Sequence, residues 1–126
     1  MTLVSDSKGL TFNSSHGNLK INTEGDFTPG DLLVTSVAGC SGLVFKKILA
    51  NRGISYDELR VDTTHKRADE KPRRFTQITI HMTLKGHGLD EKLIQRLFTH
   101  VYPNCTIAQS VKGAIDVEEE LEIVED

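Results

Sequence analysis

The feature that most constrains this chain is a long helical segment with no charged side chain. A helix is predicted to begin at Thr28–Asp31, where threonine can cap it, proline fits its first turn and aspartate completes a capping box. No formal charge follows between Leu32 and Phe45, and Gly53 is typical of a helix end. A helix that is apolar on every side must be buried on every side. Because a chain of 126 residues has too little other structure to surround it, the segment favours a homodimer that wraps two such helices.

Short segments with the alternation of β-strands lie on both sides of this helix. Before it, 9–12 and 18–22 predict a β-hairpin or small meander, and after it 56–65, 76–84 and 114–124 predict three strands. A second amphipathic helix is predicted over 90–101, ended by Pro103, with a short helix restarting at Asn104. The order of these elements predicts an α+β fold with mainly antiparallel strands, formed by residues 1–126 as a single domain.

Charge and hydropathy exclude several classes of function. The net charge of −3 argues against a nucleic-acid partner, and the basic stretch 66–74 is interrupted by Asp69 and Glu70, as expected of a solvated loop. No run of about 18 or more apolar residues is present, so no membrane-spanning helix is expected. The first residues lack the pattern of a secretory signal, which makes the cytoplasm the expected location. The five histidines are scattered without ligand spacing, so neither a metal site nor a cofactor is expected.

Two cysteines, Cys40 and Cys105, are the candidate reactive groups. They form neither a CxxC motif nor a zinc-like array, and in a reducing compartment they are not expected to be a permanent disulfide; inert buried thiols are the alternative. Cys40 lies in the middle of the apolar helix, where burial raises a thiol pKa. Cys105 is expected in the first turn of a helix, where free N–H groups favour a thiolate. Local physics therefore nominates Cys105 as the more acidic thiol.

Asp31 is a further candidate with two interpretations. It lies about two and a half helical turns before Cys40, which places the two side chains on opposite faces of a regular helix. A capping role explains Asp31 fully. A role at the cysteine site requires an irregular helix start or contact with the site of a partner subunit.

The order of several motifs resembles the OsmC/Ohr family. The segment 28–33 followed by Ala38-Gly39-Cys40 is similar to the family's proline-acidic segment and small-residue helix. Residues 66–76 and Gly86 look like the YhfA-like branch, and 102–111 matches the family's second cysteine segment. The likeness covers nearly the whole chain from residue 9 onward.

The resemblance implies an OsmC-like fold, in which antiparallel sheets wrap central helices in an intertwined homodimer with sites at the subunit interface. It also implies a thiol-dependent peroxidase that reduces organic hydroperoxides in oxidative-stress defence. Carried over, Cys40 is the attacking thiol and Cys105 the resolving thiol, which reverses the order that local physics favours. A dithiol such as a lipoylated protein is the implied reductant, with no membrane or nucleic-acid partner.

This chain departs from the family pattern at the cation that accompanies the attacking thiol. No arginine precedes Arg52, whereas peroxidases of the family carry an N-terminal one, and Asp31 stands where they usually have glutamate. Arg67 is the candidate substitute; an ordinary loop charge is the alternative. The missing arginine also motivates a second hypothesis, in which the chain is a non-catalytic module that binds a small apolar ligand or senses redox state.

Overall fold

The N-terminal part of the chain is a three-stranded antiparallel sheet in the order β1-β2-β3. Its strands are β1 (Thr2–Asp6), β2 (Gly9–Ser14) and β3 (Gly17–Ile21). The computed structural model describes all residues from 1 to 126 and divides them into two units, Met1–Thr35 and Ser36–Asp126. This sheet belongs to the first unit. It confirms the predicted meander and adds β1, which the sequence pattern did not locate.

The predicted apolar helix is α1 (Pro29–Asn51). Its start is a capping box, since the Asp31 N–H donates to Thr28 Oγ1 at 3.0 Å and the Thr28 N–H donates to Asp31 Oδ2 at 3.3 Å. The helix ends at Asn51, just before the expected glycine. Gly53 adopts a left-handed φ of 67°, and its N–H donates to the Ala50 carbonyl. Both ends of the helix are thus set by local sequence.

The second unit contains a mixed sheet in the order β4-β5-β6. Its strands are β4 (Glu58–Arg67), β5 (Phe75–Gly86) and β6 (Asp116–Glu125). The pair β4–β5 is antiparallel as expected, but β5–β6 is parallel. The predicted, mainly antiparallel arrangement is confirmed, and β5–β6 is the pair that departs from it. A long crossover through three short helices returns the chain to the edge where β5 begins. Two parallel neighbouring strands require such a long crossover connection.

The crossover consists of α2 (Glu91–Phe98), α3 (Val101–Asn104) and α4 (Thr106–Ser110). The sequence pattern predicted one helix over 90–101 that Pro103 would stop. Instead α2 ends at Phe98, and Pro103 lies within the first turn of α3, where its missing N–H is not needed. The predicted restart after it is confirmed, with Cys105 as the N-cap residue of α4.

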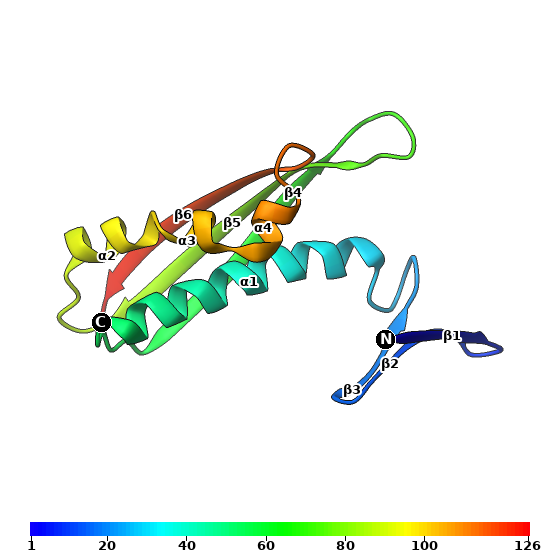
Figure 1. The fold of residues 1–126 in the computed structure, drawn as a ribbon, viewed down its shortest axis with the longest axis horizontal. Helices are drawn as coiled ribbons and strands as arrows, with labels where there is room; N and C mark the ends of the chain where they lie inside the picture. Colours follow the sequence, from blue (N-terminus) through cyan, green and yellow to red (C-terminus); the bar gives the residue numbers. More distant parts are fainter. The chain divides into compact units, whose positions relative to one another are not determined.

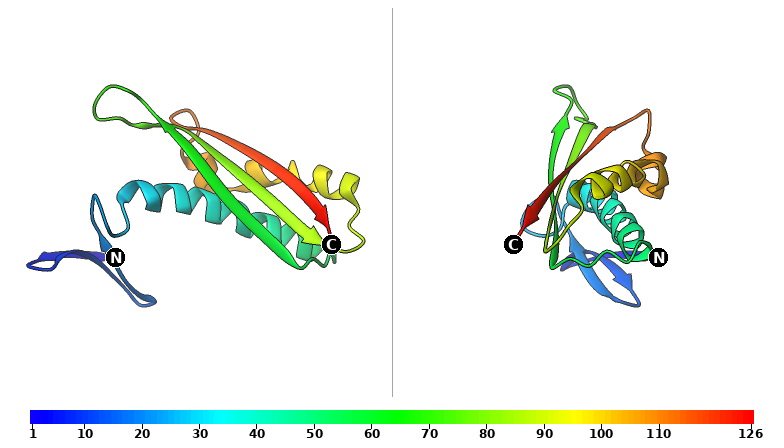
Figure 2. Two further views of the ribbon diagram at one scale, coloured as in Figure 1. Left: turned by 180° about the vertical axis from the view of Figure 1, so that it is seen from behind. Right: turned by 90° about the vertical axis from the view of Figure 1, so that its left-hand side faces the viewer.

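The core lies between the sheet and the helices, all of which cover one face of the sheet (Figures 1 and 2). The alternation of β5 is confirmed, since its inward residues have no exposed surface: Ile78, Ile80, Met82 and Leu84. Helix α1 approaches β4 closely at Gly42, where a Cβ would lie 3.4 Å from Val61 Cγ2. The rings of Phe45 on α1 and Phe98 on α2 meet edge to face at a centroid distance of 5.2 Å.

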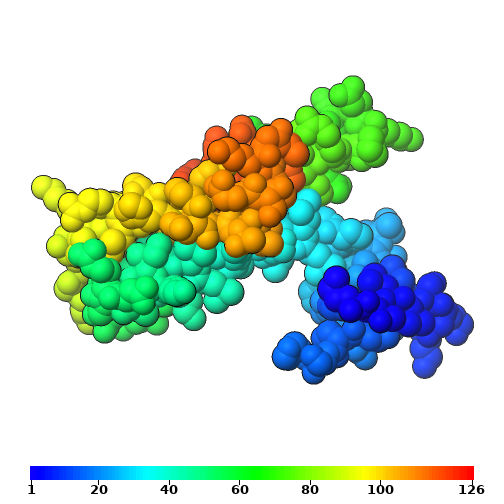
Figure 3. All heavy atoms as spheres, viewed as in Figure 1, coloured from blue at the N-terminus to red at the C-terminus, as the bar shows by residue number.

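Helix α1 is buried on one side only within the chain. Leu49 has no exposed surface, whereas Leu43 is 67% exposed, and the surface of α1 remains open to view beside α2–α4 in Figure 3. By length and composition α1 could also cross a membrane, and 39% of its apolar window is buried within the chain. The count of consecutive apolar residues did not identify this candidate span, and its length and composition alone do not show that it crosses a membrane. Core helices of soluble proteins meet the same criteria, and the buried side of α1 favours that interpretation.

Candidate active site

The structure brings the two cysteines together, although they lie on separate elements. Cys40 is on α1 and partly exposed, whereas Cys105, at the junction of α3 and α4, has no exposed surface. Both thiols are free, and the Cys40 thiol is within hydrogen-bonding reach of the Cys105 sulfur. A partly exposed thiol therefore stands beside a sealed one.

The surroundings of the Cys105 sulfur disfavour its thiolate, although its place at a helix start predicts the opposite. Burial raises the pKa of Cys105, and this effect outweighs the opposing contributions of the Ser41 hydroxyl and the Ala108 N–H, while Cys40 raises the pKa further. The predicted helix-start contact does exist, since the Ala108 N–H donates to Sγ at 3.4 Å. It is insufficient because desolvation disfavours the thiolate more than one N–H of a five-residue helix favours it.

A serine and a glutamate extend the site beyond the cysteines. The Ser41 hydroxyl, which has no exposed surface, lies 3.5 Å from Cys105 Sγ and 2.6 Å from Glu119 Oε2. Glu119 lies opposite Ile80 in the register of β5 and β6, on the face of the sheet that carries the core. Burial raises the pKa of Glu119, and the hydrogen bond from Ser41 partly offsets the rise.

Sequence reasoning missed both residues, although one signal was available. The inward positions of the last strand read Ile115, Val117, Glu119, Leu121 and Ile123. A carboxylate in an apolar register position must find a hydrogen-bond partner or stay protonated. That position marked Glu119 as unusual, but nothing in the sequence identified Ser41 as its partner.

The other two predicted site residues make different contacts within the chain. Asp31 is exposed and forms the capping box at the start of α1, which is the structural role anticipated for it. Arg67 is exposed at the end of β4, where its guanidinium carbon lies 4.3 Å from the centroid of the Phe75 ring. Their catalytic roles stay predictions.

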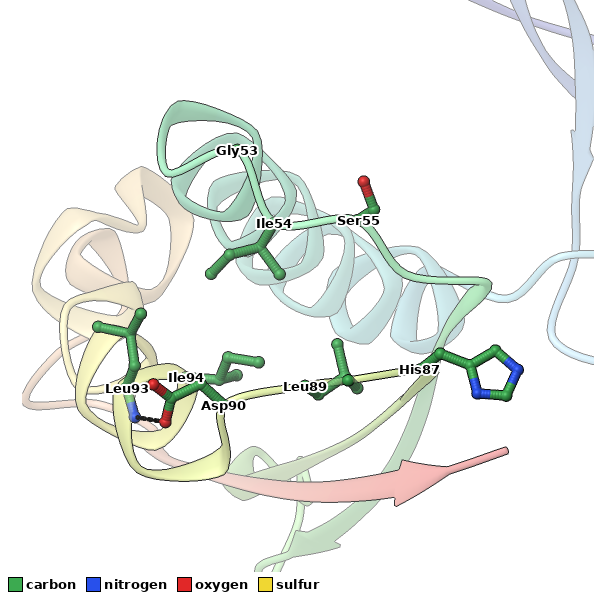
Figure 4. A pocket seen from close by; sticks show the side chains of 9 residues that line it. Gly53, Ile54, Ser55, His87, Leu89, Asp90, Leu93 and Ile94 are labelled. Carbon is green, nitrogen blue, oxygen red and sulfur yellow. Dashed lines mark hydrogen bonds between the residues drawn. The ribbon is translucent and has the colours of Figure 1, made fainter.

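Two hollows in the second unit differ in their chemistry. One, of about 310 Å³, is bounded by the end of α1 and the start of α2 (Figure 4). Its one carboxylate, Asp90, accepts from the Leu93 N–H through Oδ1 as a helix cap, and no cysteine lines this hollow. The other, of about 230 Å³, is lined by Glu119 together with Phe98, Thr99, Tyr102 and Val117. The smaller hollow is thus lined by Glu119, which is connected through Ser41 to Cys105.

Comparison with known proteins decides the family. The model for OsmC-like proteins matches residues 22–120, which include both cysteines and Glu119. This chain belongs to the OsmC family. Solved structures confirm the expected α+β fold of two small sheets and helices.

Named relatives place this OsmC-like protein among sequences and structures of similar length. It is 28% identical to protein YhfA of Escherichia coli over 126 residues, covering 93% of this chain and 92% of YhfA. A hypothetical protein from Aquifex aeolicus has a TM-score of 0.87 at 20% identity, over 99% of this chain and 95% of that one. The organic hydroperoxide resistance protein OhrB of Bacillus subtilis has a TM-score of 0.65 at 21% identity, over 96% and 95%.

The chemistry available to the site is that of a dithiol. No group of three or more metal-ligating side chains gathers in the chain. Cys40 has access to solvent, Cys105 is adjacent to it, and the serine and carboxylate beside Cys105 can accept or release a proton. These are the parts needed to oxidise one thiol and trap the product with the other.

Proposed function

We propose that this OsmC-like protein is a thiol-dependent peroxidase of organic hydroperoxides, in which Cys40 attacks the peroxide and Cys105 resolves the product. The observation that carries this function is the contact between a partly exposed and a fully buried thiol, both reduced. A relative of similar fold, OhrB, is named an organic hydroperoxide resistance protein. The buried thiol is shielded from peroxide, so the exposed one is the first to react.

The proposed cycle has three steps. The Cys40 thiolate attacks the peroxide O–O bond, which releases an alcohol and leaves a sulfenic acid. The Cys105 thiol then attacks the Cys40 sulfur, so that a disulfide forms and water leaves. A dithiol, such as that of a lipoylated protein, reduces the disulfide by exchange. The site residues of this proposal are Cys40 and Cys105, with Asp31 and Arg67 retained as candidates supplied through a partner subunit.

A homodimer in the cytoplasm is the proposed form of the protein. The support is the open side of α1, where Leu43 is 67% exposed within the stretch 32–45 that carries no charge. An apolar side chain of this size on a helix is stabilised when a second apolar surface covers it, at about 25 cal/mol per Å² buried. A second copy of this chain offers such a surface.

The direct test treats the reduced protein with cumene hydroperoxide and measures its mass and free thiols over time. The expected product is an intramolecular disulfide between Cys40 and Cys105. The variant Cys105→Ser should stop at a Cys40 sulfenic acid that dimedone traps, while Cys40→Ser should keep its remaining thiol reduced. If both thiols of the wild-type protein persist under organic peroxide and under hydrogen peroxide, peroxidase function is excluded.

A non-catalytic binding module is the second candidate function. The contact of Arg67 with Phe75 favours it, because this arginine is occupied away from the cysteines within the chain. It predicts that the apolar probe 8-anilinonaphthalene-1-sulfonate binds equally well to wild-type protein and to Cys40→Ser, and that neither protein consumes peroxide. Peroxide turnover by the wild-type protein would rule this candidate out.

A further inference from the structure

Ser41 connects Cys105 to a carboxylate on the opposite layer of the fold. Its Oγ lies 3.5 Å from Cys105 Sγ on one side and 2.6 Å from Glu119 Oε2 on the other. The three side chains come from α1, the start of α4 and the middle of β6. Ser41 and Cys105 have no exposed surface, so water does not compete for these contacts.

The Ser41 hydroxyl has two hydrogen-bonding neighbours but only one hydrogen. A hydroxyl has one hydrogen and two acceptor lone pairs, while an ionised carboxylate can only accept. The Ser41 hydroxyl can donate its one hydrogen to Cys105 Sγ at 3.5 Å or to Glu119 Oε2 at 2.6 Å. When it donates across the shorter contact to Glu119, its lone pairs are free to accept the proton of the Cys105 thiol. The other acceptor near the thiol, the Val37 carbonyl, is farther from Sγ, at 4.0 Å. The Ser41 hydroxyl therefore lies between the Cys105 thiol and the Glu119 carboxylate, where it can pass a proton from one to the other.

We propose that Glu119 accepts, through Ser41, the proton that Cys105 must lose when it attacks oxidised Cys40. This inference rests on the proposed function and adds to it a positioning residue on β6. The need for it follows from burial, because a sealed thiol holds its proton and cannot hand it to water directly.

Disulfide formation begins with the transfer of two protons. The Cys105 S–H bond breaks as its proton moves to Ser41 Oγ, and the Ser41 proton moves to Glu119 Oε2. The sulfur electron pair of Cys105 then forms a bond to the Cys40 sulfur of the sulfenic acid, whose S–O bond breaks and releases hydroxide. Cys105 is oxidised and the Cys40 sulfenic sulfur is reduced, both to the disulfide level. Hydroxide takes a proton to become water, and Glu119 returns its proton to solvent.

Glu119 has a route for that last proton. It lines the hollow of about 230 Å³ formed with the end of α2, α3 and β6. The groups facing it from the packed elements are Ser41 on α1, Thr99 after α2, Tyr102 on α3 and the apolar Ile80 on β5. Glu119 is the one carboxylate among these groups. A proton that Glu119 takes from Ser41 can therefore pass to this hollow.

The test follows both steps of oxidation in one time course, with dimedone trapping of the sulfenic acid and intact mass for the disulfide. In Glu119→Gln the amide oxygen can still accept from Ser41 but cannot take a proton. We expect Cys40 oxidation at the wild-type rate and disulfide closure slower by about 10- to 100-fold. Ser41→Ala should slow closure similarly, and the double variant should lose no more than either single variant, because the residues act in series.

A matched control and a pH profile separate the relay from a structural role. Glu118→Gln changes an exposed glutamate on the outer face of the same strand and should close the disulfide at the wild-type rate. Closure in the wild-type protein should rise as pH increases through the Glu119 ionisation, and Glu119→Gln should lack this rise. A folded Glu119→Gln protein that closes its disulfide at the wild-type rate and with the wild-type pH profile overturns the relay alone. Failure of wild-type Cys40 to oxidise overturns the peroxidase function, and the relay with it.

Discussion

The two cysteines of this protein occupy opposite kinds of environment a short distance apart. Cys40 lies on the open side of a long helix and is partly exposed, whereas Cys105 caps a short helix and is sealed. Judged by local position, Cys105 should be the acidic thiol and Cys40 the inert one. Burial opposes the first of these expectations, since it raises the pKa of Cys105 despite its place at a helix start. The depth of a side chain in the folded protein thus outweighs its position along a helix.

The largest expected effect comes from removing each thiol in turn. Cys40→Ser should lower peroxide consumption by roughly a thousandfold or more, as loss of a nucleophile usually does. Cys105→Ser should still oxidise Cys40 in its first turnover but should not form a disulfide. Peroxide consumption measured together with dimedone labelling separates the two steps. The comparison fails if Cys105→Ser abolishes the first oxidation of Cys40.

The two sides of α1 provide a second contrast. Phe45→Ala, on the sealed side against Phe98, should lower the free energy of unfolding by about 3–5 kcal/mol. Leu43→Ala, on the open side, should change it by less than about 1 kcal/mol in a monomer. Urea denaturation at two protein concentrations measures both. A large, concentration-dependent loss for Leu43→Ala would instead show that a second copy covers this side.

The sealed thiol also predicts how stability varies with pH. Because the pKa of Cys105 is raised in the folded protein, the unfolded chain loses this proton first as pH rises. The contribution of the Cys105 thiol to the free energy of unfolding is fully present below its pKa in the unfolded chain, about 8.5. It is lost as pH rises through the higher pKa of the folded protein. The free energy of unfolding should therefore decline above that pH. Cys105→Ala should reduce the decline, and an unchanged slope would mean that Cys105 is not sealed in solution.

The smallest expected effect concerns Arg67. Its contact with Phe75 predicts that Arg67→Ala lowers the free energy of unfolding by about 0.5–1 kcal/mol, as for an exposed cation–π pair. The rate of Cys40 oxidation tests the proposed site role of Arg67, and Arg60→Ala, at an exposed arginine on the same strand, is the control. Stopped-flow peroxide kinetics measure this rate, and equal rates for the two variants would leave Arg67 with its contact to Phe75 alone. A rate loss of about tenfold or more for Arg67→Ala alone would place this arginine at the site.

Much of the fold was predictable because its signals are local. The capping box at Thr28 and Asp31, the stop at Gly53 and the alternation of β5 each depend on residues a few positions apart. The expectation that Pro103 would stop the helix failed because proline is disfavoured in the interior of a helix but tolerated in its first turn. Pro103 lies in the first turn of α3. The parallel pairing of β6 with β5 was missed because strand direction depends on where the crossover returns the chain.

By itself the sequence determined that Cys40 lies in an uncharged stretch of a long helix and that Cys105 lies at the start of another helix. It also determined that the order of motifs is that of an OsmC-like protein. Only the tertiary structure decided that these thiols meet, that Cys105 is sealed, and that Glu119 reaches it through Ser41. The physical reason is range. Helix starts and strand alternation arise from hydrogen bonds and packing between near neighbours in the chain. Desolvation and proton transfer depend on atoms from α1, α4 and β6 that become neighbours only when the layers pack.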